Sequence, residues 1–502
     1  MIGLVRVHAK VVLDNTGATT RLPVLLTEHG PVLPLLRYFA AHFHCRSQSW
    51  MSNTAQAVEL LLEYVATNAP AFTSGEDLFR GYMRAMYGGT ISGYGIDPSG
   101  LYWRPRRTAN ANVLIAGVAN FSDWLAKQGL ARPLNPRDLS PSGHDLTLAM
   151  AAYEHRRSRA FLGHAMPTAQ EASPLVRVSP RRTAPMVDNH DRPPSFPEDQ
   201  FSRLITDGFV RRGYKGHADV IERINARDAL IALLMHGGGL RVSEPFHLWV
   251  HDVQVHPEDP TQAVVRIYHP SDGLAPGDWL TPDGTRTKNR ADYLKLRYAR
   301  TPRHLLYGSP QWAGWKHNAL DSRQTMSMAV SWRSPEFARL FLVLWTRWLR
   351  ERAMYEPNHP YAFTTMKLGQ RGGGHPGSIY TVSAFIGAHR RAVERIGLVA
   401  AKANGTTPHG HRHAMGQLMT DLELPPAAIM KILHHCSLES QNPYTRPSFS
   451  KANELLQRAN ERLRSGTVEA SKPLSQTNLM QLLKGELSGV PGESLAKKRR
   501  NR

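Results

Sequence analysis

Five residues between positions 241 and 444 of this 502-residue chain carry groups that can act on a phosphodiester: Arg241, His409, Arg412, His435 and Tyr444. Guanidinium groups bind phosphate oxygens in a bidentate manner and stay charged at any physiological pH. A phenol can serve as a nucleophile when a base and a positive field help to remove its proton. The inventory favours attack of a tyrosine on a DNA phosphodiester that two arginines hold.

His409 and Arg412 stand at a predicted helix start. Thr407 can be the N-cap and Pro408 the first helical residue, which is a common beginning for a helix. Residues three apart share one helix face, and the free amides of a first turn attract anions. The segment therefore predicts a phosphate-binding corner, with a histidine-rich surface turn as the alternative.

A metal site is the other interpretation of this segment, because His409, His411 and His413 alternate. On a helix, that spacing directs His411 away from the other two. The sequence nearby offers no acidic partner, and Cys436 lacks a second cysteine. We expect no metal and no cofactor.

Arg241 follows three glycines at the end of an apolar, helix-like segment. The glycines allow a tight turn and a close approach of the backbone to a ligand. Leu240 and Val242 flank the arginine, so we expect its base to be buried and its direction to be set. A structural ion pair with Glu244 or Asp252 is the alternative.

Taken together, these segments resemble the tyrosine recombinases, or phage-type integrases. That family has an Arg after a Gly-Leu turn with Ser-Glu and a later Asp, then His-x-x-Arg, Leu-Gly-His, and a Tyr nine residues further on. The chain presents the same order over roughly residues 200 to 460, in GGGLRVSEPFHLWVHDV, HGHR, LHH and Tyr444.

The resemblance implies a role for each residue. Arg241 and Arg412 would hold the scissile phosphate, and Tyr444 would attack it. His409 would assist proton removal from the phenol, and His435 would hydrogen-bond a phosphate oxygen. The product would be a 3′-phosphotyrosine link with a free 5′-hydroxyl.

The family also uses a lysine on a β-hairpin as the general acid. Here DGTRTKNRADYLKL offers Lys288, in a turn before a predicted strand, and Lys295 is the rival. The chain departs from the family pattern at three places. His434 stands where a glycine is usual, Pro443 directly precedes Tyr444, and the segment from 256 to 308 is longer than typical.

The elements that position these residues indicate a mainly α protein with a small β-sheet (α+β). Alternation at residues 1–30 predicts a strand or hairpin, and helical spacing within 31–165 predicts a four-helix unit. That unit resembles the core-binding domain of the family in its architecture. A proline-rich linker is expected at 166–197. A catalytic domain is expected at 198–465, with two predicted strands, AVVRIYH and ADYLKLRYA. The basic tail, 466–502, is expected to be disordered.

Charge points to the partner. Lys and Arg number 62 against 41 acidic residues, which gives a net charge of +21 and favours double-stranded DNA over a membrane surface. The resemblance implies a homotetramer on two duplexes. The two cysteines, Cys45 and Cys436, do not form a disulfide framework, so we expect a cytoplasmic protein associated with the bacterial nucleoid.

The predicted function is site-specific DNA recombination, as the integrase or excisionase of a mobile element. A type IB topoisomerase or telomere resolvase is an alternative with the same nucleophile. A DNA-binding protein with an inactive catalytic fold is an alternative from another class.

Overall fold

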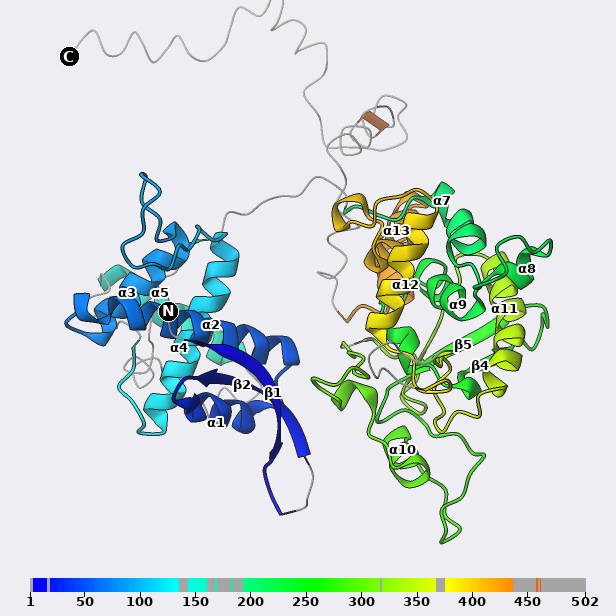
Figure 1. The fold of residues 1–502 in the computed structure, drawn as a ribbon, viewed down its shortest axis with the longest axis horizontal. Coiled ribbons are helices and arrows are strands. Elements are labelled where there is room, and N and C mark those ends of the chain that lie inside the picture. Colours follow the sequence, from blue (N-terminus) through cyan, green and yellow to red (C-terminus); the bar gives the residue numbers. More distant parts are fainter. Residues whose placement is uncertain are drawn as a thin grey trace, which may run out of the picture.

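The computed structural model describes residues 3–15, 19–134, 143–159, 168, 182–183, 193–316, 318–366, 375–436, 457–458 and 461. Separate buried cores form in the N-terminal part, within residues 22–121, and in the C-terminal part, within residues 196–433. These two parts are the blue-cyan and green-orange units of Figure 1.

A three-stranded antiparallel sheet opens the chain, with the order β1-β2-β3. Its strands are β1 (Val5–Val12), β2 (Thr19–Thr27) and β3 (Gly30–Pro31), and Val5 pairs with Leu26. Leu22 and Leu25 of β2 are buried against the helices that follow. The strand or hairpin predicted for residues 1–30 is therefore confirmed.

Four helices follow, as the helical spacing predicts: α1 (Leu33–His42), α2 (Gln48–Asn68), α3 (Gly75–Gly88) and α4 (Thr108–Lys127). Ser74 caps α3, since its hydroxyl accepts a hydrogen bond from the amide of Asp77 at 3.1 Å. A fifth helix, α5 (Gly143–Arg159), was not expected from the sequence.

The C-terminal unit is mostly helical around a small sheet. Its longer elements are α7 (Glu198–Arg203), α8 (Val220–Arg223), α9 (Ala226–His236), β4 (Val253–Val255), β5 (Ala263–Tyr268), α10 (Arg290–Tyr298), β6 (Ser327–Ala329), α11 (Pro335–Ala353), α12 (Val382–Arg395), α13 (Pro408–Asp421) and α14 (Pro426–Ile432). The connections contain a five-residue π-helix, η4 (Leu204–Gly208), and the 3-10 helices η5 (Glu244–His247), η6 (Val250–Asp252), η7 (Arg303–Leu305) and η8 (Lys402–Asn404). The α+β class predicted from the sequence is confirmed.

Helix α9 lies at the centre of this unit, and every one of its residues is buried. It packs against α11, α12 and α13, while β4, β5 and β6 form an antiparallel sheet in which Val253 pairs with Val265 and Arg266 with Ala329. A helix without a polar face needs cover on all sides. Its C-terminal end is therefore held rigidly, and Arg241 lies just beyond that end.

The prediction of one strand is wrong, because the segment forms a helix. ADYLKLRYA, predicted as a strand, is the helix α10. The side chain of Asn289 caps it by accepting from the amide of Asp292 at 2.9 Å, and Ala299 ends it with a left-handed φ of 51°. The adjacent residues Tyr293 and Leu294 are both buried, which suits a helix and not the alternation of a strand.

The N-terminal sheet also contacts the C-terminal unit. Arg21 Nη1 of β2 donates to the carbonyl oxygen of Gly308 at 2.7 Å. Most of the predicted linker at 166–197, and the tail from 466, lie outside the described residues. Among the helices of the described residues, none is long and apolar enough to cross a membrane.

Candidate active site

The glycine turn that carries Arg241 is required by its surroundings. Helix α9 ends at His236 with Gly237 as its C-cap, and Gly239 has a left-handed φ of +67°. A Cβ on Gly239 would lie 2.7 Å from Leu433 Cδ2 and 3.2 Å from Met415 Cγ. The turn therefore touches both α13 and the end of α14, which brings three distant segments together.

Arg241 is anchored where the turn ends. Its Nη1 donates to Glu244 Oε1 at 2.8 Å and also to Asn318 Oδ1, and its amide donates to Glu244 Oε2 at 2.8 Å. Asn318 Nδ2 donates to the same carboxylate at 3.0 Å. The side chain of Arg241 stays 17% exposed while that of Glu244 is buried, so the guanidinium is oriented but still accessible.

The pairing of Arg241 with Glu244, considered above as an alternative to a functional role, is thus present. It does not exclude that role, because one carboxylate leaves other guanidinium donors for a ligand. Asp252 has a different partner: it forms a buried two-point ion pair with Arg290, between the rings of Trp249 and Tyr268.

Helix α13 begins as the sequence predicts, with Thr407 as N-cap and Pro408 first. The threonine side chain makes no capping hydrogen bond; instead the amide of Gly410 donates to the carbonyl oxygen of Thr407 at 2.9 Å. The rings of His409 and His413 lie together on one side, with centroids 4.3 Å apart. His411 is fully buried and faces other partners, as expected for a helix.

Arg412 is buried and connects the two other segments of the site. Its Nη1 donates to the carbonyl oxygen of Gly239 at 2.6 Å, and its Nη2 donates to that of Leu433 at 2.7 Å. Gly239 lies two residues before Arg241, and Leu433 lies two residues before His435. A single guanidinium therefore spans the glycine turn and the end of α14.

The backbone conformation at His434 explains why glycine suits the position before His435. Its φ is +52°, in the left-handed region that glycine adopts at little cost. The turn is kept in place from outside, since the amide of Ala319 donates to the carbonyl oxygen of His434 at 3.2 Å. Both His434 and His435 are buried, at 2% and 3% exposure. His434 therefore adopts the left-handed conformation that a glycine would take at this position.

The pKa values show that the candidates lie within one electrostatic centre. Loss of solvation lowers the pKa of His409, and the positive charges of Arg412 and Arg241 lower it further. Burial, followed by the charges of Arg412 and Arg241, lowers the pKa of His435 to about 3. The structure thus gathers Arg241, His409, Arg412 and His435, and both imidazoles are neutral near pH 7.

Two lysines other than Lys288 and Lys295 act on this centre. After burial and the charge of Arg412, the charges of Lys316 and Lys402 lower the pKa of His409. Lys288 is exposed, in a hairpin-like loop closed by the Leu274–Asn289 bridge, and Lys295 is exposed on α10. Figure 1 shows α10 at one end of the unit, well apart from α13.

Lys316 and Asn318 were both missed from the sequence. They lie in WKHNAL, a segment without helical or strand periodicity, in the long connection between β5 and β6. The one usable signal was position, because this connection ends at a strand of the central sheet. Tyr444 and Pro443 lie outside the described residues, so the nucleophile stays a prediction.

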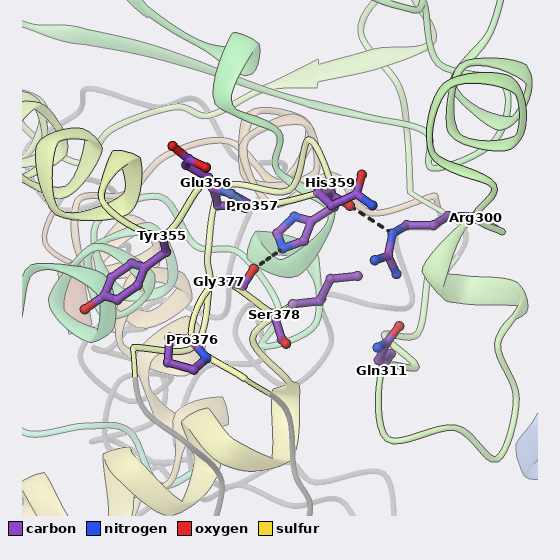
Figure 2. Close-up of a pocket in the computed structure, with 11 residues that line it drawn as sticks. Arg300, Gln311, Tyr355, Glu356, Pro357, His359, Pro376, Gly377 and Ser378 are labelled. Atoms are coloured by element: carbon purple, nitrogen blue, oxygen red, sulfur yellow. Dashed lines mark hydrogen bonds between the residues drawn. The ribbon is translucent and has the colours of Figure 1, made fainter.

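Of two cavities that the described residues line, one lies apart from this centre and the other reaches the residue before His435. Figure 2 shows a cavity of about 250 Å³ beside His359 and Arg300, where His359 Nε2 donates to the carbonyl oxygen of Gly377 at 3.0 Å. None of the candidate catalytic residues lines it. A second cavity, of about 460 Å³, reaches His434 between β5, β6 and α14.

No protein-family model matches the chain, and no curated protein matches it. Among solved structures, it is similar to the XerA recombinase, with 14% identity, a TM-score of 0.31, and coverage of 85% of this chain and 97% of that one. It is also similar to the XerH site-specific recombinase bound to difH substrate, with 13% identity, a TM-score of 0.42, and coverage of 81% and 79%.

A third similar structure is the Tn1549 transposon integrase in complex with transposon right-end DNA. The identity is 15% and the TM-score is 0.33, with coverage of 80% of this chain and 99% of that one. These three solved structures are thus two recombinases and a transposon integrase.

Proposed function

We propose that this chain is a tyrosine recombinase, a DNA strand transferase that cuts and rejoins DNA through a 3′-phosphotyrosine intermediate. The observation that carries the proposal is that Arg412 of α13 is hydrogen-bonded both to the turn that leads to Arg241 and to the end of α14 beside His435. The charges of both arginines lower the pKa of His409 and of His435. Two fixed guanidinium groups can offset the charge that builds up on the non-bridging oxygens of a pentacoordinate phosphorus.

The neutral histidines suit the chemistry. In the proposed step the Tyr444 oxygen bonds to phosphorus, the bond to the 5′-oxygen breaks, and the phenol proton passes to His409. A neutral imidazole can accept that proton, whereas an imidazolium cannot. His435, also neutral, can donate a hydrogen bond to a phosphate oxygen and needs no proton transfer of its own.

The general acid in this proposal is Lys316, in place of Lys288 or Lys295. Its charge, like that of Lys402, lowers the pKa of His409, and it lies two residues before Asn318, which contacts Arg241. Both observations support a role for Lys316 near the phosphate. It would deliver a proton to the departing 5′-oxygen, which leaves as a hydroxyl. Asn318, two residues on, orients Arg241, so one short segment would serve both leaving-group protonation and phosphate binding.

The wider role follows from charge and chemistry. A net charge of +21 suits binding to the backbone of double-stranded DNA. The phosphotyrosine ester conserves the energy of the broken bond, so a second strand can reverse the step. We propose integration or excision of a mobile element, by a homotetramer on two duplexes, in the cytoplasm at the bacterial nucleoid.

The test is a suicide substrate with a nick beside the cleavage site. Wild-type protein should form a protein–DNA adduct that survives SDS, and Tyr444→Phe should form none. An adduct with both proteins would refute Tyr444 as the nucleophile. DNA binding without an adduct in either would favour the inactive DNA-binding alternative.

A second assay separates the recombinase from the topoisomerase and resolvase alternatives. A recombinase should exchange strands between two copies of its site and should act on unrelated supercoiled plasmid weakly. Relaxation of any supercoiled plasmid, without exchange between sites, would favour the topoisomerase alternative. Conversion of a site into covalently closed hairpin ends would favour the telomere resolvase.

A further inference from the structure

Three buried histidines from three helices form a hydrogen-bonded chain directly behind the candidate active site. His236 ends α9, His389 lies on α12, and His411 lies on α13. His236 Nδ1 is 3.2 Å from His411 Nδ1, and His389 Nε2 is 2.8 Å from His411 Nε2. All three are at most 1% exposed. The site chemistry proposed above uses none of them.

The geometry excludes a shared metal ion. His411 uses one ring nitrogen toward His236 and the opposite ring nitrogen toward His389, so no single point is reached by all three rings. The described residues contain no group of histidine, cysteine or acidic side chains that could hold a metal. The contacts are therefore N–H···N hydrogen bonds between neutral imidazoles.

Neutrality follows from burial. Loss of solvation lowers the pKa of His389 to about 3, and it lowers the pKa of His411 well below its usual range. Each neutral ring has one N–H and one acceptor nitrogen, so the protons of the chain must all point the same way. One ring turned over, or one ring replaced, would leave a buried nitrogen without its hydrogen bond.

Aromatic rings and one ion pair hold the chain in place. Phe196 stacks on His411 with centroids 4.3 Å apart, and Phe201 stacks on His236 at 3.8 Å. At the outer end, His236 Nε2 lies 3.3 Å from Glu198 Oε2 and 3.0 Å from Arg333 Nη1. The three rings therefore have little freedom to move separately.

The place of the chain in the sequence gives it a consequence. His236 directly precedes the three glycines that lead to Arg241, and His411 lies between His409 and Arg412. The His236–His411 hydrogen bond thus joins the segment of the first arginine to the helix of the second. The bond from Arg412 to Gly239 joins the same two segments on the side of the site.

We propose that His411 is a positioning residue, which holds α13 in register with the glycine turn so that both arginines meet one phosphate. His411 holds the glycine turn through its hydrogen bond with His236, and the hydrogen bond with His389 on the opposite side of the ring fixes the orientation of His411. The chain acts through the arginines and touches no substrate. The kinetic test of this proposal rests on the proposed strand-transfer function. The structural test requires only that the protein folds.

Substitutions can remove the two hydrogen bonds of His411 one at a time. His411→Asn keeps a polar group near the Nδ1 position, toward His236, while His411→Gln keeps one near the Nε2 position, toward His389. His411→Phe keeps the ring that packs on Phe196 but makes neither hydrogen bond. His359→Phe is the matched control, because His359 is equally buried, at 2% exposure, and lies beside the cavity of Figure 2.

The experiment measures single-turnover adduct formation by the full chain on the nicked substrate at saturating DNA, together with DNA affinity. A shift of about 1 Å in a positioning element can cost about 100-fold in rate. We expect His411→Phe to lose about that factor with affinity unchanged, His411→Asn to recover more than His411→Gln, and His359→Phe to keep the wild-type rate per folded molecule. Equal rates for His411→Phe and His359→Phe would overturn the proposal.

A structural readout keeps the test independent of activity. The guanidinium Nε–H resonances of Arg241 and Arg412 should both shift in His411→Phe and stay in place in His359→Phe. If wild-type protein forms no adduct, the proposed function fails, and these resonances still decide the positioning role. Unmoved arginine resonances in a folded His411→Phe protein would reject it.

Discussion

Arg412 Nη1 donates to the carbonyl oxygen of Gly239 at 2.6 Å, which attaches the second arginine of the candidate site to the turn that carries the first. The two arginines are 171 positions apart in the sequence, between 241 and 412. Their relative position therefore depends on main-chain geometry at one glycine. That dependence makes the glycine turn the most sensitive place for substitution outside the reacting groups.

Gly239→Ala should destabilise the protein and slow cleavage. The substitution forces a left-handed φ on alanine, at about 1–2 kcal/mol, and places a Cβ 2.7 Å from Leu433 Cδ2, at about 1–3 kcal/mol more. Denaturant unfolding measures the sum. Gly397→Ala is the control, because Gly397 has a φ of +88° with nothing within 4 Å of an added Cβ. Equal losses for the two variants would contradict the packing argument.

Glu244→Ala should cost more stability than the removal of a half-exposed carboxylate. Its buried carboxylate accepts hydrogen bonds from Arg241 and Asn318, and loss of one partner from a buried pair costs about 3–5 kcal/mol. Glu222→Ala, which removes a half-exposed carboxylate near Arg211 and Arg347, should cost about 0–1 kcal/mol. Urea unfolding of both variants checks the difference, and a Glu244→Ala loss below 1 kcal/mol would show that the anchor is not needed.

Lys316→Ala should slow cleavage about 100-fold or more if Lys316 is the general acid. A substrate with sulfur in place of the bridging 5′-oxygen has a leaving group that needs no proton, so it should restore the rate. Lys288→Ala should cleave both substrates at near the wild-type rate. The opposite result, with Lys288→Ala slow and rescued by sulfur, would return the role to the lysine predicted from the sequence.

Stability should fall as the pH drops below about 6.5. Burial is the main cause that lowers the pKa of His359, His389 and His435 to about 3, and of His304 and His413 to about 4. The unfolded chain has histidines of pKa about 6.5, so below that pH it binds more protons than the folded chain. The stability these groups contribute is complete above about pH 6.5 and is lost between that pH and the folded pKa values.

Thermal unfolding from pH 8 to pH 4.5 measures this loss. Each such histidine should contribute a slope of up to about 1.4 kcal/mol per pH unit. His359→Phe should reduce the slope by the contribution of one histidine, up to about 1.4 kcal/mol per pH unit. The stability above pH 7 should stay independent of pH. A melting temperature that stays constant down to pH 5 would show that these rings are not buried as neutral groups.

Much of the helical architecture was predictable from local patterns. The four helices between residues 33 and 127, the apolar helix before the glycine turn, and the helix that starts at Pro408 follow from apolar spacing and from proline and glycine positions. ADYLKLRYA was misread because a nine-residue apolar pattern fits a strand or a helix. Only the Asn289 cap and the burial of adjacent residues distinguish the two.

The sequence by itself determined the chemical inventory: two arginines, two histidines and a tyrosine at spacings that predict phosphate chemistry. It also determined the glycine at 239 and the helix start at 408, because both depend on local backbone preferences. Tertiary structure alone decided that His411 faces two other histidines. His236 is 175 positions from His411 and His389 is 22 positions from it, and no local propensity encodes contacts between residues so far apart.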